Sequence, residues 1–134
     1  MMLGTDLCGP SCSACWVTSR AAAATPAQTW DAVADFSTTQ NPAGAWSYGW
    51  MPTGSTTAFS AYPLTVATCG LSGWIHPSIP ATCVLKTDQP VAATCSTLTV
   101  QPNFLDVHPG PGGEYAVVRW TAPATASYNV AIGV

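Results

Sequence analysis

The segment Asn41-Pro-Ala-Gly-Ala-Trp-Ser-Tyr-Gly-Trp50 decides the fold class of this chain. It opens on a turn, because Asn and Pro start turns and the Gly that follows them accepts a positive φ. Aromatic residues then alternate with small ones, so Trp46, Tyr48 and Trp50 share one face of a strand. A turn followed by a period-two aromatic pattern predicts a β structure.

Short alternating segments separated by turn signals continue along the chain on both sides of this stretch. Upstream, Trp30 to Phe36 alternates and predicts a strand. Segment 68–80 is expected to be a loop, and 108–113 must be one because of its prolines and glycines. Further strands are expected at 58–66, 82–86, 96–101, 104–107, 114–120 and 127–134. We therefore expect an all-β domain over 28–134, built from two antiparallel sheets packed face to face.

Composition limits the classes of partner. Charged residues make up only 7% of the chain, against about 25% in an average domain. The net charge is −3, and the basic residues Arg20, Lys86 and Arg119 are scattered. Nucleic acid and anionic lipid surfaces require a basic stripe, so they are excluded as expected partners. No apolar run approaches the roughly 18 residues of a transmembrane helix, so no transmembrane segment is expected.

The first 27 residues form a leader with two open interpretations. Ala21 to Ala27 is similar to the small-residue region at which export signals are cleaved, but Asp6 and the missing early Lys or Arg argue against one. The leader is thus either a degenerate export signal or a disordered segment. Six cysteines suggest an oxidising compartment. Fifteen pairings exist for six cysteines, and Cys69 with Cys83 is the expected one, since both flank the same Gly- and Pro-rich segment.

Two stretches resemble a known kind of domain. They are Ala34-Asp-Phe-Ser-Thr-Thr-Gln-Asn-Pro-Ala-Gly-Ala-Trp-Ser-Tyr-Gly-Trp50 and His108-Pro-Gly-Pro-Gly-Gly-Glu-Tyr-Ala-Val-Val-Arg-Trp-Thr-Ala-Pro123. Together they resemble a β-sandwich domain of exported bacterial proteins, many of which end in a PEP-CTERM sorting tail. The resemblance covers roughly residues 28 to 134. It implies a jelly-roll-like sandwich, similar in shape to carbohydrate-binding modules, that is secreted or displayed on a bacterial cell surface.

The chain departs from this pattern at its C-terminus. Related sequences continue with further strands past the point that corresponds to Val134, and the sorting tail is absent here. The resemblance therefore implies a sandwich truncated at the C-terminus, with an open strand edge. Such an edge could pair with a strand of a partner or of a second copy.

Four aromatic residues are the candidate ligand contacts: Trp46, Tyr48, Trp50 and Trp74. Sugar rings stack on exposed aromatic faces, and Trp offers the largest platform. Period-two aromatics more often pack in a core, however, so the stripe at Trp46, Tyr48 and Trp50 has both interpretations. Trp74 lies in an expected loop, which makes it the best single candidate for a ligand contact.

Asp106, His108 and Glu114 surround the Pro/Gly loop and could converge on a metal ion. Catalytic zinc needs three protein ligands, and His76 is far away in sequence. The alternative is a turn network in which Glu114 pairs with Arg119 or accepts backbone N–H groups, and it is the favoured interpretation.

Two other groups of residues have spacings that are found in metal sites. Asp31 and Asp35 would share a strand face, where carboxylates are solvent-exposed or bind calcium. Cys8, Cys12 and Cys15 match an iron–sulfur spacing, but such radical enzymes need a barrel of about 200 residues or more. Chance or a disulfide explains that spacing better.

The sequence predicts a non-catalytic exported or cell-surface domain that binds a carbohydrate or another extracellular polymer. The alternative is a structural or adhesive component of an exported surface protein, with a surface protein as its partner and all its aromatics buried. An enzyme would require distant carboxylates or histidines to converge in a pocket. No catalytic residue, metal ligand or cofactor is predicted.

Overall fold

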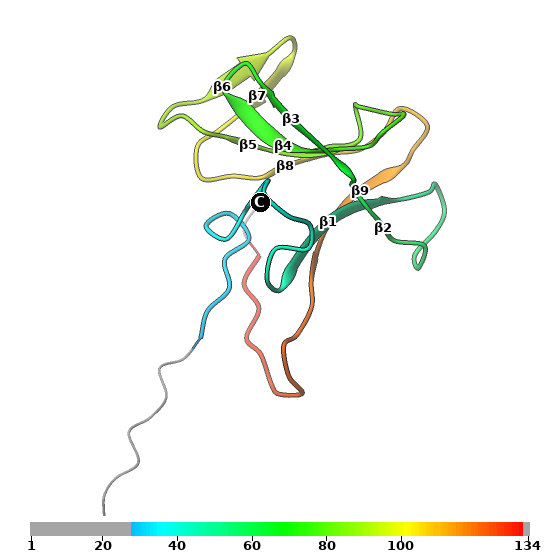
Figure 1. Cartoon of the computed structure of the whole chain (residues 1–134), viewed down its shortest axis with the longest axis vertical. Helices are drawn as coiled ribbons and strands as arrows, with labels where there is room; N and C mark the ends of the chain where they lie inside the picture. The colour runs from blue at the N-terminus through cyan, green and yellow to red at the C-terminus, as the bar shows by residue number, and fades with distance from the viewer. Residues whose placement is uncertain (1–27, 133–134) are drawn as a thin grey trace, which may run out of the picture.

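The computed structural model describes residues 28–132, which form nine antiparallel strands (Figure 1). The expectations for the leader and its three cysteines lie outside these residues. No helix of the described part is long and apolar enough to cross a membrane. The strands are β1 (Trp46–Met51), β2 (Ser60–Ala61), β3 (Leu64–Thr68), β4 (Leu71–Ile75), β5 (Cys83–Thr87), β6 (Ala93–Cys95), β7 (Leu98–Val100), β8 (Asp106–His108) and β9 (Tyr115–Trp120).

Three sheets result, in the orders β2-β1-β9, β3-β4-β5-β8 and β6-β7. The first two face each other across a core of Tyr48, Tyr62, Trp74 and Val84. Tyr48 of β1 is 0% exposed, and its neighbours Trp46 and Trp50 pack against the same cluster. The expected aromatic face of the β1 segment therefore points between the sheets. The expected all-β sandwich is confirmed, whereas its jelly-roll topology stays a prediction.

A second core lies on the opposite face of the four-stranded sheet. Leu71, Cys83 and Leu85 are buried there, beneath the β6–β7 hairpin. β4 and β5 are thus buried on both faces. The expected loop over 68–80 is wrong, since Leu71–Ile75 is β4. Gly73 is a turn signal by residue type. In the structure this glycine instead allows two strands to approach closely, because a Cβ there would lie 2.7 Å from the Leu85 side chain.

The expected strand over 30–36 is also wrong, because residues 32–35 form a turn. Asp31 Oδ1 accepts hydrogen bonds from the N–H groups of Val33 and Ala34, at 2.8 and 3.0 Å. The N–H of Asp35 donates to the carbonyl oxygen of Asp31 at 2.8 Å. An Asp side chain that offers the backbone a local partner competes with strand pairing, and here it overrides the alternating pattern.

The last expected strand, 127–134, is absent from its described part, 127–132. The alternating residues Val130 and Ile132 are 76% and 85% exposed. No face of the sandwich buries them, so the apolar alternation has nothing to pack against.

The disulfide joins Cys69 to Cys95 rather than to Cys83. Strand register explains the correction. Cys69 follows β3 next to the end of β4 where Leu71 pairs with Thr87, whereas Cys83 lies at the opposite end of β5, paired with Ile75. These ends are roughly 13 Å apart along the strand. Cys95 of β6 lies instead within 5.4 Å of Cys69, measured between Cα atoms.

Candidate functional site

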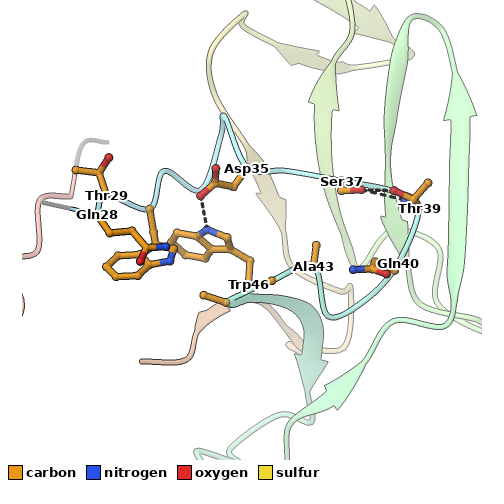
Figure 2. Close-up of a pocket in the computed structure, with 11 residues that line it drawn as sticks. Gln28, Thr29, Asp35, Ser37, Thr39, Gln40, Ala43 and Trp46 are labelled. Carbon is orange, nitrogen blue, oxygen red and sulfur yellow. Dashed lines mark hydrogen bonds between the residues drawn. The ribbon is translucent and has the colours of Figure 1, made fainter. Parts of the chain in front are cut away.

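An open cleft of about 430 Å³ lies along the segment that leads into β1 (Figure 2). Within the part of the chain that the structure describes, its lining comes from residues 28–46, because the turn at 32–35 folds this segment back on itself. Two indoles, those of Trp30 and Trp46, lie among hydroxyl and amide side chains. The polar lining side chains are Gln28, Thr29, Asp35, Ser37, Thr39 and Gln40.

The carboxylate of Asp35 fixes the indole of Trp46. The Nε1–H of Trp46 donates to Asp35 Oδ2 at 3.1 Å, a contact drawn in Figure 2. The same oxygen accepts the backbone N–H of Asp31 at 3.0 Å. Trp46 is partly buried and also packs against the core between the sheets. The ring is therefore held in one orientation at the cleft.

Trp30 belongs to an aromatic cluster with Trp120 and Tyr128. Its ring meets theirs edge to face, with centroid separations of 5.5 and 5.8 Å, and Trp120 and Tyr128 meet at 4.8 Å. Such pairs are favourable because the positive edge of one ring faces the negative face of the other. The end of β9 and the C-terminal segment thus support one wall of the cleft.

The other wall, the loop 37–41, is tied to both sheets. The indole N–H of Trp74 in β4 donates to the carbonyl oxygen of Ser37 at 2.8 Å. The side chain of Asn41 bonds to the backbone of Tyr48 in β1. The Ser37 and Thr39 hydroxyls also hydrogen-bond to each other (Figure 2). These bonds to rigid strands give the loop a defined shape before any ligand arrives.

The four aromatic residues expected to touch a ligand occupy different environments. Trp46 lines the cleft. Tyr48 is 0% and Trp74 is 6% exposed, so both are enclosed between the sheets. Burial raises the pKa of the Tyr48 phenol to about 12. Trp50 is partly buried and lies edge-on to the ring of His76, with a centroid separation of 4.3 Å.

Sequence reasoning missed Trp30, because the segment 30–36 was assigned to a strand and not to a turn. The signal that could have found it is Asp31. An Asp followed by small residues and a second Asp at Asp35 is typical of a turn held by its own side chains. Recognising that turn would have removed Trp30 from the expected strand.

The residues around the Pro/Gly loop do not form one site. Glu114 accepts the backbone N–H of Gly112 at 3.0 Å, which confirms the turn-network interpretation. His108 Nδ1 lies 3.0 Å from the carbonyl oxygen of Ala81 and 2.9 Å from that of Pro109, so this nitrogen is the donor. Burial raises the pKa of Asp106. Arg119 is exposed and stacks 3.9 Å from the centroid of the Phe59 ring.

Asp35 is the one ionisable side chain that residues 28–132 contribute to the lining of the cleft. Backbone N–H groups of Ala34 and Val33 lower the pKa of neighbouring Asp31, which does not line the cleft. Within residues 28–132, no three His, Cys, Asp or Glu side chains gather where a metal ion could bind.

The chain matches no protein-family model, no curated protein and no solved structure in three separate comparisons.

Proposed function

We propose that this domain binds a carbohydrate chain in the cleft between Trp30 and Trp46, as a non-catalytic module of an exported or cell-surface protein. The observation that supports it is the lining: two indoles, surrounded by amides and hydroxyls, in an open cleft of about 430 Å³. Indole faces stack on the C–H faces of sugar rings. Amides and hydroxyls both donate and accept, as the hydroxyl groups of sugars do.

The openness of the cleft favours a polymer over a small metabolite. Small-molecule sites usually enclose most of their ligand, whereas this cleft is open to solvent. The Cys69–Cys95 disulfide supports an oxidising location outside the cytoplasm.

The test is binding to soluble neutral polysaccharides (hydroxyethyl cellulose, laminarin, arabinoxylan and galactomannan) by affinity electrophoresis and calorimetry. Gln28→Ala and Gln40→Ala each remove an exposed lining amide. We expect each to weaken binding about two- to tenfold, the value of one hydrogen bond. Gln101→Ala, an exposed amide outside the cleft, is the matched control and should bind as the wild type does. Trp30→Ala should weaken binding at least tenfold.

A structural or adhesive role is the second candidate. The burial of Tyr48 and Trp74 favours this role, because these two of the four candidate aromatic residues stabilise the fold and expose no surface on which a ligand could stack. A folded wild-type protein that binds none of the four polysaccharides would favour this role over sugar binding.

A further inference from the structure

We propose that Asp35 makes the cleft selective for uncharged glycans and excludes polymers of acidic sugars such as uronates. The inference rests on the proposed function and goes beyond it by naming a specificity-determining residue and a class of sugar. It follows from where this carboxylate lies and from which charges surround it.

The carboxylate lies at the surface that a sugar would touch. Asp35 lines the cleft and is exposed, and its Oδ2 contacts the indole N–H of Trp46, the platform on which a ring would stack. Both hydrogen bonds to this side chain use Oδ2. A sugar ring stacked on Trp46 would therefore bring its substituents close to a negative group.

Among residues 28–132, no cation in the lining offsets this charge. Lys86 does not line the cleft: its ammonium donates to the carbonyl oxygen of Val33 at 2.8 Å and acts on Asp31. Arg119 lies on the outer face of the β2-β1-β9 sheet, stacked on Phe59. From the described lining residues, a uronate carboxylate in the cleft would thus meet one like charge and no partner of opposite charge.

The size of the effect follows from Coulomb's law. Two like charges about 6 Å apart, in a medium between protein and water, repel enough to weaken binding on the order of tenfold. The repulsion is screened by salt, because the Debye length falls from about 30 Å at 0.01 M to about 3 Å at 1 M. Neutral ligands have no such dependence.

The experiment compares two sets of polymers, the neutral polysaccharides named above and the acidic polymers polygalacturonate and alginate, on wild type, Asp35→Asn and Asp88→Asn. Asn at position 35 keeps an oxygen that can accept from Trp46 and Asp31 while removing the charge. Asp88→Asn makes the same change in net charge at an exposed carboxylate that bonds to Ser72 and lies outside the cleft. Thermal unfolding confirms that each variant is folded.

We expect the wild type to bind a neutral polymer at least tenfold more tightly than either acidic polymer at 0.01 M salt. Asp35→Asn should tighten acidic-polymer binding about tenfold and leave neutral binding within twofold, while Asp88→Asn should match the wild type. Raising the salt to 1 M should reduce the difference between the wild-type affinities for neutral and for acidic polymers. Equal wild-type binding of neutral and acidic polymers, or no gain in Asp35→Asn, would overturn the selectivity while sugar binding stands. Wild type that binds none of the polymers would overturn the sugar site itself.

Discussion

The side-chain amide of Asn41 pairs with the backbone of Tyr48 in both directions. Its Oδ1 accepts the N–H of Tyr48 at 3.0 Å, and its Nδ2 donates to the carbonyl oxygen of Tyr48 at 2.6 Å and to that of Tyr62 at 3.1 Å. One side chain thus supplies the acceptor for the backbone N–H of a residue that is 0% exposed, and it adds a donor to the carbonyl oxygen that also accepts the N–H of Tyr62. It also joins the loop 37–41 of the cleft to the central strand of its sheet.

Asn41→Ala should lower the free energy of unfolding by about 1 to 3 kcal/mol, because the buried N–H of Tyr48 loses its acceptor. Asn41→Asp should cost more at neutral pH, since a carboxylate would face the carbonyl oxygens of Tyr48 and Tyr62. Urea denaturation measures both values. Gln40→Ala, at the exposed neighbouring position, should stay within about 0.5 kcal/mol of the wild type. An Asn41→Ala variant as stable as Gln40→Ala would contradict this account.

The Cys69–Cys95 disulfide closes a loop of 26 residues between the β3–β4 turn and the β6–β7 hairpin. The chain-entropy model predicts that removing it costs about 3.5 kcal/mol. The double variant Cys69→Ser with Cys95→Ser should show this loss in thermal unfolding. Thr68→Ala with Thr97→Ala changes exposed neighbours on the same two turns and should cost far less. Stability of the serine variant equal to that of this control would show that the bond contributes little.

Asp106 has a buried oxygen, Oδ2, without a hydrogen-bond partner, and burial raises the pKa of the carboxyl group. A raised pKa means that the folded state disfavours the ionised form. Ionised Asp106 therefore lowers the free energy of unfolding, and this loss is present in full above the folded-state pKa. It disappears as the pH falls below the unfolded-state pKa of about 3.9.

Replacing Asp106 by Asn should accordingly raise the free energy of unfolding at pH 7, on the order of 1 kcal/mol. The gain should vanish near pH 3, where the wild-type carboxyl group is protonated in both states. Denaturation at a series of pH values checks the sign. Asp88→Asn is the comparison, because the carboxylate of Asp88 is exposed and accepts from Ser72 at 2.8 Å. A stabilisation that persists at pH 3 would rule out the charge as its cause.

Much of the fold was predictable because alternation at the aromatic stripe and at β9 reflects burial of one strand face. The β1 and β9 segments were expected at 46–50 and 114–120 and lie at Trp46–Met51 and Tyr115–Trp120. β4 was not predicted, because it is buried on both faces and includes a glycine. Burial on both faces removes the alternation of apolar and polar residues, and the glycine resembles a turn signal. A local sequence pattern does not distinguish a glycine that lets two strands approach closely from a glycine that forms a turn.

The site was predictable only in part. Trp46 was a candidate from its residue type, and it lines the cleft. The cleft itself depends on a turn held by Asp31, whose side-chain bonds outweigh the strand preference of the residues around it. The partner indole, Trp30, reaches its place through contacts with Trp120 and Tyr128, far away in sequence. No short-range pattern encodes contacts at that separation.

Lys86 is the single lysine of the sequence, and its ammonium holds the carbonyl oxygen of Val33 in the turn that frames the cleft. Amine-directed coupling, whether to a sensor surface, a fluorophore or a bead, has few other targets on this chain. Acylation of Lys86 would remove the charge and disturb the turn at Val33. Attachment through an engineered tag would leave that contact intact, so the manner of immobilisation itself could decide whether a binding assay detects the proposed glycan.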